Sequence, residues 1–365
     1  MAVNIVFVRE SAQGERRVAL TPETAKKLAA LGANLVIERG AGVPAHFPDA
    51  AYVGATVVDD ADAALAQADV LVCVQPPSND RLARLKPGAV LVGLLAPHAD
   101  AGRVDALVAA RVSGFSLERL PRTTRAQAMD VLSSQAGMAG YKAVLIAAQL
   151  APRYFPMLTT AAGTIRPSKV LIVGAGVAGL QAIATARRLG AQVEGFDVRP
   201  ETREQIESLG GKFLDLGVSA AGEGGYAREL TAEERAEQQK RLGEHLKTVD
   251  VIVTTAAVPG RPAPKIITAA MVSGMKPGSV IVDLAAETGG NCELTRPGET
   301  IDSGGVTIAG PLNLASQGAM HASEMYARNV FNFLALSLKD GQLVLDWNDE
   351  LIARTCLAHA GERKA

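Results

Sequence analysis

Short apolar runs alternate along most of the chain with longer segments in which apolar positions recur every third or fourth residue. The short runs indicate buried strands and the longer segments indicate amphipathic helices. In the first part of the chain the predicted strands are NIVFVRE (4–10), NLVIE (34–38), DVLVCVQ (69–75), AVLVGLL (89–95) and VSGFSL (112–117). A helix is predicted over TPETAKKLAALG, with Thr21 as N-cap, Pro22 at its first position and Gly32 beyond its end, and another near 100–110. This alternation predicts an α/β fold with a parallel sheet.

The alternation starts again after a long predicted helix from about Ser133 to Leu150. Further strands are predicted in SKVLIV, AQVEGFD, VDVIVTT, GSVIVDLA and GVTIAG. The last fifty or so residues, from about Gln317, are predicted to be helical, to have no strand partner of their own, and to pack on the first domain. We therefore predict two Rossmann-like, doubly wound domains. The first is discontinuous (1–136 plus 319–365), and the second (137–318) is a standard dinucleotide-binding domain.

Composition narrows the class of protein. The net charge of −1 gives no reason to expect nucleic acid or an anionic membrane as a direct ligand. The apolar runs are far shorter than the ~20 residues of a membrane span, and the first strand starts at Val3, which leaves no room for a signal peptide. Cys73, Cys292 and Cys356 lack metal-ligand spacing, as do the five histidines. We expect reduced thiols, a cytosolic protein and no metal site.

The stretch VLIVGAGVAGLQAI has the G-x-G-x-x-G spacing of a dinucleotide fingerprint between a predicted strand and a predicted helix. The second predicted strand ends at Asp197, 23 residues after Gly174 and close to the ~20 that the fold requires. Asp197 can accept hydrogen bonds from a ribose and repel a 2′-phosphate, which favours NAD over NADP, whereas Arg199 is a weak signal in the other direction. The alternative is a glycine-rich turn that binds no nucleotide. The cofactor-binding residues predicted here are Gly174, Gly176, Val177, Gly179, Asp197, Val198 and Arg199.

A glycine-rich segment at about 215–231, DLGVSAAGEGGYAREL, interrupts the predicted nucleotide domain where a short connection is expected. Its glycines allow many backbone conformations. We expect a mobile lid that orders when the cofactor binds, with Gly225 and Tyr226 against the cofactor. The alternative is a surface insertion without a role in binding.

Four stretches together resemble the soluble NAD(H)-binding component (domain I, alpha subunit) of proton-translocating nicotinamide nucleotide transhydrogenases. They are RTTRAQAMDVLSSQAGMAGYKAV, GAGVAGLQAIATARRLGA with FDVRPE, GGYARELTAEE, and VTTAAVPGRPAPKIIT. The resemblance covers essentially the whole chain and implies hydride transfer between NAD(H) held here and NADP(H) held by a partner component. It also implies a homodimer, membrane-spanning partner components, no membrane insertion of this chain, and a cytoplasmic place at the inner face of the cell membrane.

The resemblance gives the polar stretch RTTRAQAMDVLSSQ a role at the nicotinamide end of the cofactor. It implies that Ser133 and Asp130 address the carboxamide and ribose, that Arg122 pairs with Asp130, and that Gln127 reaches toward the second nucleotide. Thr123, Thr124 and Arg125 are implied as further cofactor-binding residues. Hydride transfer between two C4 atoms moves no proton, so hydroxyls, amides and an ion pair are a sufficient inventory. The alternative is a polar linker that caps the following helix.

Alanine dehydrogenase, a structural relative of that family, is the competing enzyme class. Its reaction needs an acid or base, and that family has a lysine after the third strand and a histidine after the fourth. Here the first place is occupied by Cys73, Val74 and Gln75, and the second by Ala96 with His98 two residues later. These departures disfavour an amino-acid oxidoreductase. A third possibility is an NAD-binding module without enzymatic activity.

Overall fold

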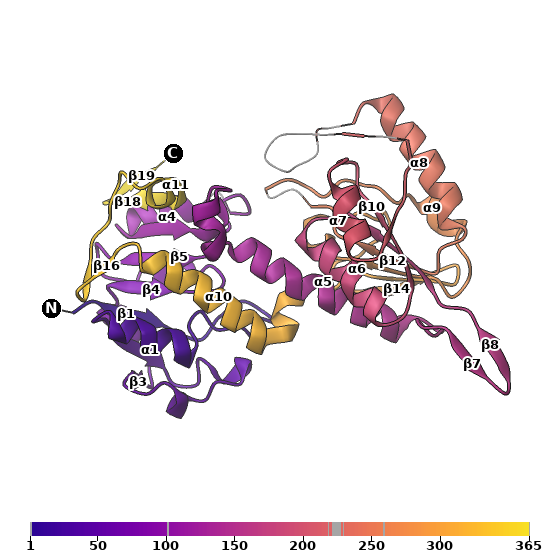
Figure 1. Cartoon of the computed structure of the whole chain (residues 1–365). Coiled ribbons are helices and arrows are strands. Elements are labelled where there is room, and N and C mark those ends of the chain that lie inside the picture. Colours follow the sequence, from indigo (N-terminus) through magenta and orange to yellow (C-terminus); the bar gives the residue numbers. More distant parts are fainter. Residues whose placement is uncertain are drawn as a thin grey trace. The chain divides into compact units, whose positions relative to one another are not determined.

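The computed structural model describes residues 2–100, 102–217, 219–220, 228, 230–257 and 260–364. The chain forms two compact units, Met1–Gln135 with Ala315–Ala365, and Ala136–Leu314. Each contains a largely parallel sheet with helices, so the predicted α/β fold of Rossmann type is confirmed (Figure 1). Gly225 and Tyr226, predicted to contact the cofactor, lie outside the described residues.

The sheet of the first unit has eight strands in the order β19-β18-β6-β5-β4-β1-β2-β3. Six of them are parallel: β1 (Asn4–Phe7), β2 (Asn34–Glu38), β3 (Thr56–Val58), β4 (Val70–Val72), β5 (Val90–Gly93) and β6 (Ser113–Ser116). The chain builds outward from β1 in both directions, so the order reverses between β1 and β4. In open α/β sheets ligands bind at such a reversal, outside the carboxyl ends of the strands.

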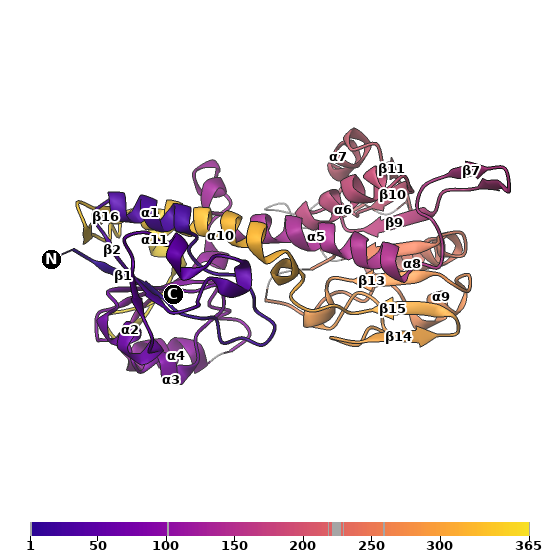
Figure 2. The same cartoon turned by 90° about the horizontal axis from the view of Figure 1, so that it is seen from below.

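Successive strand residues point to opposite faces, which gives the first unit two cores. Ile5, Phe7 and Phe115 belong to the core on one face, together with Leu28 of α1 and Tyr326 of α10. The other face carries a second core, which includes Val6, Leu71, Leu65 and Leu107. Figure 2 shows α1 and α10 on one side of this sheet and α2, α3 and α4 on the other. The helices are α1 (Pro22–Ala30), α2 (Ala61–Gln67), α3 (Asn79–Leu82), α4 (Gly102–Ala109), α10 (Ala319–Leu334) and α11 (Glu350–Thr355).

The prediction of an all-helical end of the chain is wrong. After α10 come a small hairpin, β16 (Leu338–Lys339) with β17 (Gln342–Leu343), then α11, and then β18 (Cys356–His359) and β19 (Glu362–Arg363). β18 pairs antiparallel with β6, so this segment has a strand partner after all. β18 has only four residues, and its pairing register shifts between Cys356 and Ala358. A strand this short has no clear period of its own, and its pairing with a distant strand decides its conformation.

The second unit contains a seven-stranded sheet in the order β11-β10-β9-β12-β13-β15-β14. Its parallel strands are β9 (Lys169–Val173), β10 (Gln192–Phe196), β11 (Lys212–Phe213), β12 (Val251–Thr254), β13 (Val280–Asp283) and β15 (Val306–Ala309), and the antiparallel edge strand is β14 (Thr300–Ser303). The order reverses between β9 and β12. This is the doubly wound arrangement of dinucleotide-binding domains.

Helices cover both faces of this second sheet. α5 (Val131–Leu150) begins in the first unit, and its residues from Ala136 onward belong to the second. α5 and α6 (Val177–Arg188) pack in one core, while α8 (Ala232–Leu246) and α9 (Ala269–Ser273) pack in the other. The remaining elements are α7 (Thr202–Ser208) and a hairpin of β7 (Leu158–Thr160) with β8 (Gly163–Ile165).

Candidate cofactor site

The turn between β9 and α6 is shaped by two glycines that no other residue could replace without a clash. Gly174 has φ +96°, and a Cβ there would lie 2.7 Å from Thr255 Oγ1. A Cβ on Gly179 would lie 1.8 Å from the carbonyl oxygen of Gly174, so only glycine lets the helix approach the strand so closely. These two positions therefore fix the turn itself.

The middle glycine of the fingerprint is different, because it faces open space. No atom of the described chain lies within 4 Å of the position that a Cβ on Gly176 would occupy, and the residue is exposed. Gly176 is the N-cap of the 12-residue helix α6 and has no side chain with which to cap it. The positive end of the helix dipole and its first N–H groups therefore face an open surface beside Val177, which is 46% exposed. Such a surface suits the pyrophosphate of a dinucleotide.

Asp197 follows β10 and lies within hydrogen-bond distance of the same turn. Its Oδ2 accepts a hydrogen bond from Ala175 N (2.8 Å) and from Arg199 Nη2 (2.7 Å). Its Oδ1 accepts hydrogen bonds from the backbone N and the Nε of Arg199, both at 2.9 Å. Burial by itself would raise the pKa of the Asp197 carboxyl, but the hydrogen bonds from Arg199 and Ala175 lower it overall. Asp197 is thus an anion held against the fingerprint turn and paired with Arg199.

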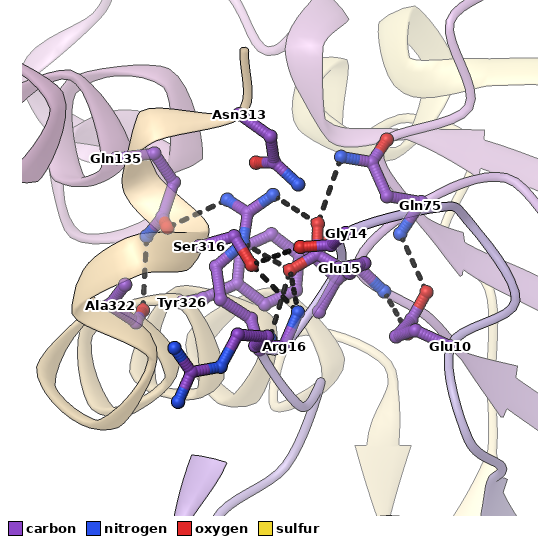
Figure 3. Close-up of polar contacts among 12 residues, drawn as sticks. Glu10, Gly14, Glu15, Arg16, Gln75, Gln135, Asn313, Ser316, Ala322 and Tyr326 are labelled. Carbon is purple, nitrogen blue, oxygen red and sulfur yellow. Dashed lines mark hydrogen bonds and ion pairs between the residues drawn. The ribbon is translucent and has the colours of Figure 1, made fainter. Parts of the chain in front are cut away.

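The corresponding crevice of the first unit is filled by the chain's own carboxylates. At the carboxyl end of β4, Glu10 accepts hydrogen bonds from Val74 N (2.7 Å) and Gln75 N (3.0 Å) (Figure 3). At the end of β5, Glu118 accepts hydrogen bonds from the backbone N–H groups of Leu95 (3.2 Å) and Ala96 (2.5 Å). The N–H groups that could bind an external anion are therefore already used in this unit. Of the two sheet reversals, the one in the second unit is the one suited to a nucleotide.

Glu10 belongs to a buried polar network that the sequence patterns did not reveal. Arg17 and Glu15 form a bidentate ion pair, with Nε–Oε1 at 2.8 Å and Nη2–Oε2 at 2.6 Å. Arg17 Nη1 also donates to Gln135 Oε1 (2.9 Å), and Gln75 Nε2 donates to Glu15 Oε2 (3.1 Å) (Figure 3). Burial raises the pKa of the Glu10 carboxyl from its ordinary 4.5 to about 7, against the lowering effect of its backbone hydrogen bonds. The available signal was the density of charges in RESAQGERR, between a strand and a helix.

Several polar side chains of the stretch 122–135 have structural partners. Asp130 accepts hydrogen bonds from Ser133 N (2.9 Å) and Ser133 Oγ (2.6 Å), and thereby caps the start of α5. Arg125 forms a bidentate ion pair with Asp349, the N-cap of α11. The capping role weighed as an alternative for this stretch is therefore present, at least at Asp130. A capping carboxylate still has an edge available to a ligand.

Other side chains of the same stretch are available for binding. Arg122, Thr124 and Gln127 are exposed. The hydroxyl oxygen of Thr123 is buried, and it has no hydrogen-bond partner among the residues that the structure describes. The predicted site residues 122–133 belong to the first unit, and those of the fingerprint, 174–199, belong to the second.

The chemistry of the described residues is that of binding and not of metal catalysis. Within the described ranges there is no group of three histidine, cysteine or carboxylate residues that could hold a metal ion. Cys73, Cys292 and Cys356 are buried free thiols, and burial raises the pKa of each. Among the described helices, none combines the length and the apolar character needed to cross a membrane.

Comparison with known proteins agrees with this geometry. The family models for the N-terminal and C-terminal domains of alanine dehydrogenase/PNT match residues 6–139 and 143–364. The chain is 46% identical to the first of the NAD(P) transhydrogenase alpha-subunit chains of Rhodospirillum rubrum, over 98% of this chain and 97% of that protein. The crystal structure of transhydrogenase from Sinorhizobium meliloti superimposes with a TM-score of 0.90 at 44% identity, covering 98% of this chain and 99% of that one. The alanine dehydrogenase of Mycolicibacterium smegmatis is 29% identical over 79% of this chain and 74% of its own.

The chain therefore belongs to the alanine dehydrogenase/PNT family, on the branch of the NAD(P) transhydrogenase alpha subunits. The predicted family and the predicted enzyme class are both confirmed. Membership implies binding of a nicotinamide dinucleotide. Gln75 stands in the region where the sequence comparison with alanine dehydrogenases expects a lysine, and its amide is bound to Glu15, so this position offers no proton carrier.

Proposed function

We propose that the chain is the NAD(H)-binding component of a proton-translocating transhydrogenase and that it exchanges hydride with NADP(H) on a partner component. The observation that carries this proposal is the contrast between the two sheet reversals. The reversal in the second unit offers an uncapped helix beside an open Gly176, whereas the reversal in the first unit is filled by Glu10. One dinucleotide site per chain requires a partner to supply the second nucleotide.

In this proposal the chain contributes binding and orientation. The N-terminus of α6 binds the pyrophosphate, and Asp197 addresses the adenosine ribose. Asp130, Ser133, Arg122 and Gln127 orient the nicotinamide end. The nicotinamide supplies the hydride chemistry, and the residues around it need no acid or base. Positioning alone can account for a large part of the rate of such a transfer.

The site is proposed to prefer NAD(H) over NADP(H). Arg199 binds Asp197 through both Nε and Nη2, so its charge is matched by the carboxylate at the end of β10. A 2′-phosphate at this position would bring further negative charge next to a buried carboxylate. We propose that NADP(H) is bound on the partner component instead.

The chain is further proposed to work as a homodimer that associates, through its partners, with the cytoplasmic face of the cell membrane. The hairpin β7–β8 extends from the second unit (Figure 1). It and its flanks expose Tyr154 (55%), Met157 (64%) and Ile165 (45%). A two-stranded hairpin is marginally stable in water on its own, so a second copy of the chain is the proposed cover. Sedimentation of an Ile165→Asp variant tests this: an unchanged association constant would remove the hairpin from the dimer contact.

Hydride-transfer assays decide between the functions. The chain would be mixed with an NADP(H)-binding component, and reduction of an NAD analogue by NADPH would be followed. Transfer that requires both components supports the proposal. NADH oxidation by an oxo acid with ammonia, without the partner, would instead make the chain an alanine dehydrogenase. Binding of NADH with no transfer in either assay would leave a binding module.

A further inference from the structure

Asn291 is fully buried and lies directly behind the cofactor crevice of the second unit. It follows a short 3₁₀ turn (Ala286–Thr288) and two glycines with positive φ, Gly289 and Gly290. Its Oδ1 accepts a hydrogen bond from Ala256 N (3.0 Å), and its Nδ2 donates to Ala256 O (2.8 Å) and to Pro264 O (2.9 Å). All the amide hydrogens and the amide oxygen therefore have partners. The reversed amide would put NH₂ against an N–H donor, so the orientation is determined.

Ala256 is held because it borders the fingerprint turn. Thr255, which follows β12, donates from its hydroxyl to Gly174 O (3.0 Å). A Cβ on Gly174 would lie 3.2 Å from Ala256 N, so this backbone and the turn are in close contact. β9 and β12 are the neighbouring strands between which the sheet order reverses. The two-way pairing with Asn291 thus fixes a peptide unit at the edge of the crevice.

The segment that carries Asn291 is itself fixed by a buried carboxylate. Asp283, at the end of β13, accepts hydrogen bonds from Cys292 N (3.0 Å) and Thr295 Oγ1 (2.6 Å) with one oxygen, and from Thr254 Oγ1 (2.8 Å) and Ala285 N (3.0 Å) with the other. A Cβ on Gly290 would lie 2.7 Å from this carboxylate. Two polar layers therefore lie behind Ala256, and neither depends on an exposed side chain.

The place of Ala256 indicates which half of a dinucleotide it meets. A dinucleotide crosses the crevice so that each of its nucleotides lies over one half of the sheet. The half that ends with Asp197 holds the adenosine. The backbone that follows β12 then faces the nicotinamide half, where small displacements affect the rate most strongly.

We propose that Asn291 is a positioning residue for the nicotinamide half of the cofactor, and that it acts by fixing the backbone of Ala256. This inference rests on the proposed function of the site. It assigns a role in the transfer step to a residue that touches no reacting atom and lies outside both sequence stretches predicted to bind the cofactor.

The test compares Asn291→Ala and Asn291→Asp with Ser168→Ala. Asn291→Asp keeps the acceptor for Ala256 N but places a carboxylate against two carbonyl oxygens. Ser168 is the control, because its buried hydroxyl donates to Tyr154 O (2.7 Å) just before β9, at the opposite end of the strand from the crevice. Measured for each variant are the dissociation constants of ADP and NADH, the rate of hydride transfer with the NADP(H)-binding component, and the urea midpoint.

We expect both Asn291 variants to bind ADP as the wild type does, to bind NADH no more than about 10-fold more weakly, and to lose about 10- to 100-fold in transfer rate. Ser168→Ala should lower the urea midpoint and keep the rate. If ADP affinity, NADH affinity and rate fall together, or if the Asn291 variants do not fold, the residue is structural and the proposal is overturned. If the wild type itself transfers no hydride, the proposed function fails, while the comparison of ADP with NADH still tests Asn291.

Discussion

The buried carboxylate of Glu10 should make the stability of the first unit fall as the pH rises from about 5 to about 8. In the folded chain the pKa of Glu10 is about 7, against an ordinary 4.5, because burial disfavours its charge. Glu15 adds to this rise and Arg17 opposes it. Between these two values the folded state holds a proton that the unfolded chain releases. The stabilisation is therefore complete below about 4.5 and is lost as the pH rises through about 7.

The step from 4.5 to about 7 corresponds to roughly 3 kcal/mol, at ~1.4 kcal/mol for each pH unit. Most of it falls between pH 5 and 8, so the expected loss in that range is about 2 to 3 kcal/mol. This is a large share of the stability of a typical domain, which is ~5–15 kcal/mol.

Urea unfolding at pH 5, 6, 7 and 8 measures this loss. Trp347, the single tryptophan of the chain, stacks on Phe115 with ring centroids 6.3 Å apart, so its fluorescence reports on the first unit. Glu10→Gln removes the titrating group and should flatten the wild-type curve. Glu23→Gln is the control, since Glu23 is exposed and its hydrogen bonds with Lys27 and Arg328 lower its pKa, away from this range. Parallel curves for the wild type and Glu10→Gln would refute the reasoning.

Three further predictions concern the cofactor. Gln127→Asn should keep NADH affinity and lose roughly 100-fold in transfer rate, because a shift near 1 Å is enough to spoil the geometry; an unchanged rate would return this residue to a linker. Gly176→Ala should weaken NADH binding without changing the urea midpoint, whereas Gly179→Ala should destabilise the second unit, because only the latter Cβ meets chain atoms; equal midpoints for the two would contradict this. Asp197→Asn should narrow the preference for NADH over NADPH by on the order of 10-fold, as measured by fluorescence titration; an unaltered ratio would place the discrimination elsewhere.

Local patterns were sufficient for the parts of this protein that are locally encoded. Alternating apolar runs predicted the parallel strands and the doubly wound fold, since a strand buried on both faces reads as a continuous apolar run. The cap at Thr21, the helix after it and the long α5 follow from the same kind of short-range signal. The turn at Gly174 was also readable, because the fingerprint, the strand before it and the helix after it all lie within one stretch of sequence. The family followed from motifs of the same length.

Only the tertiary structure decided the features that join residues distant in sequence. The sequence places Glu10 in a polar loop; packing against Val74 and Gln75, more than sixty positions away, makes it a buried carboxyl group with a raised pKa. Arg125 reads as a ligand-binding cation, and its pairing with Asp349 depends on the return of the chain after α10. β18 exists as a strand because β6 presents an edge to it. Periodicity and motif spacing carry information about neighbours in sequence, and hydrogen bonds across such separations form only where the fold has brought the partners together and excluded water.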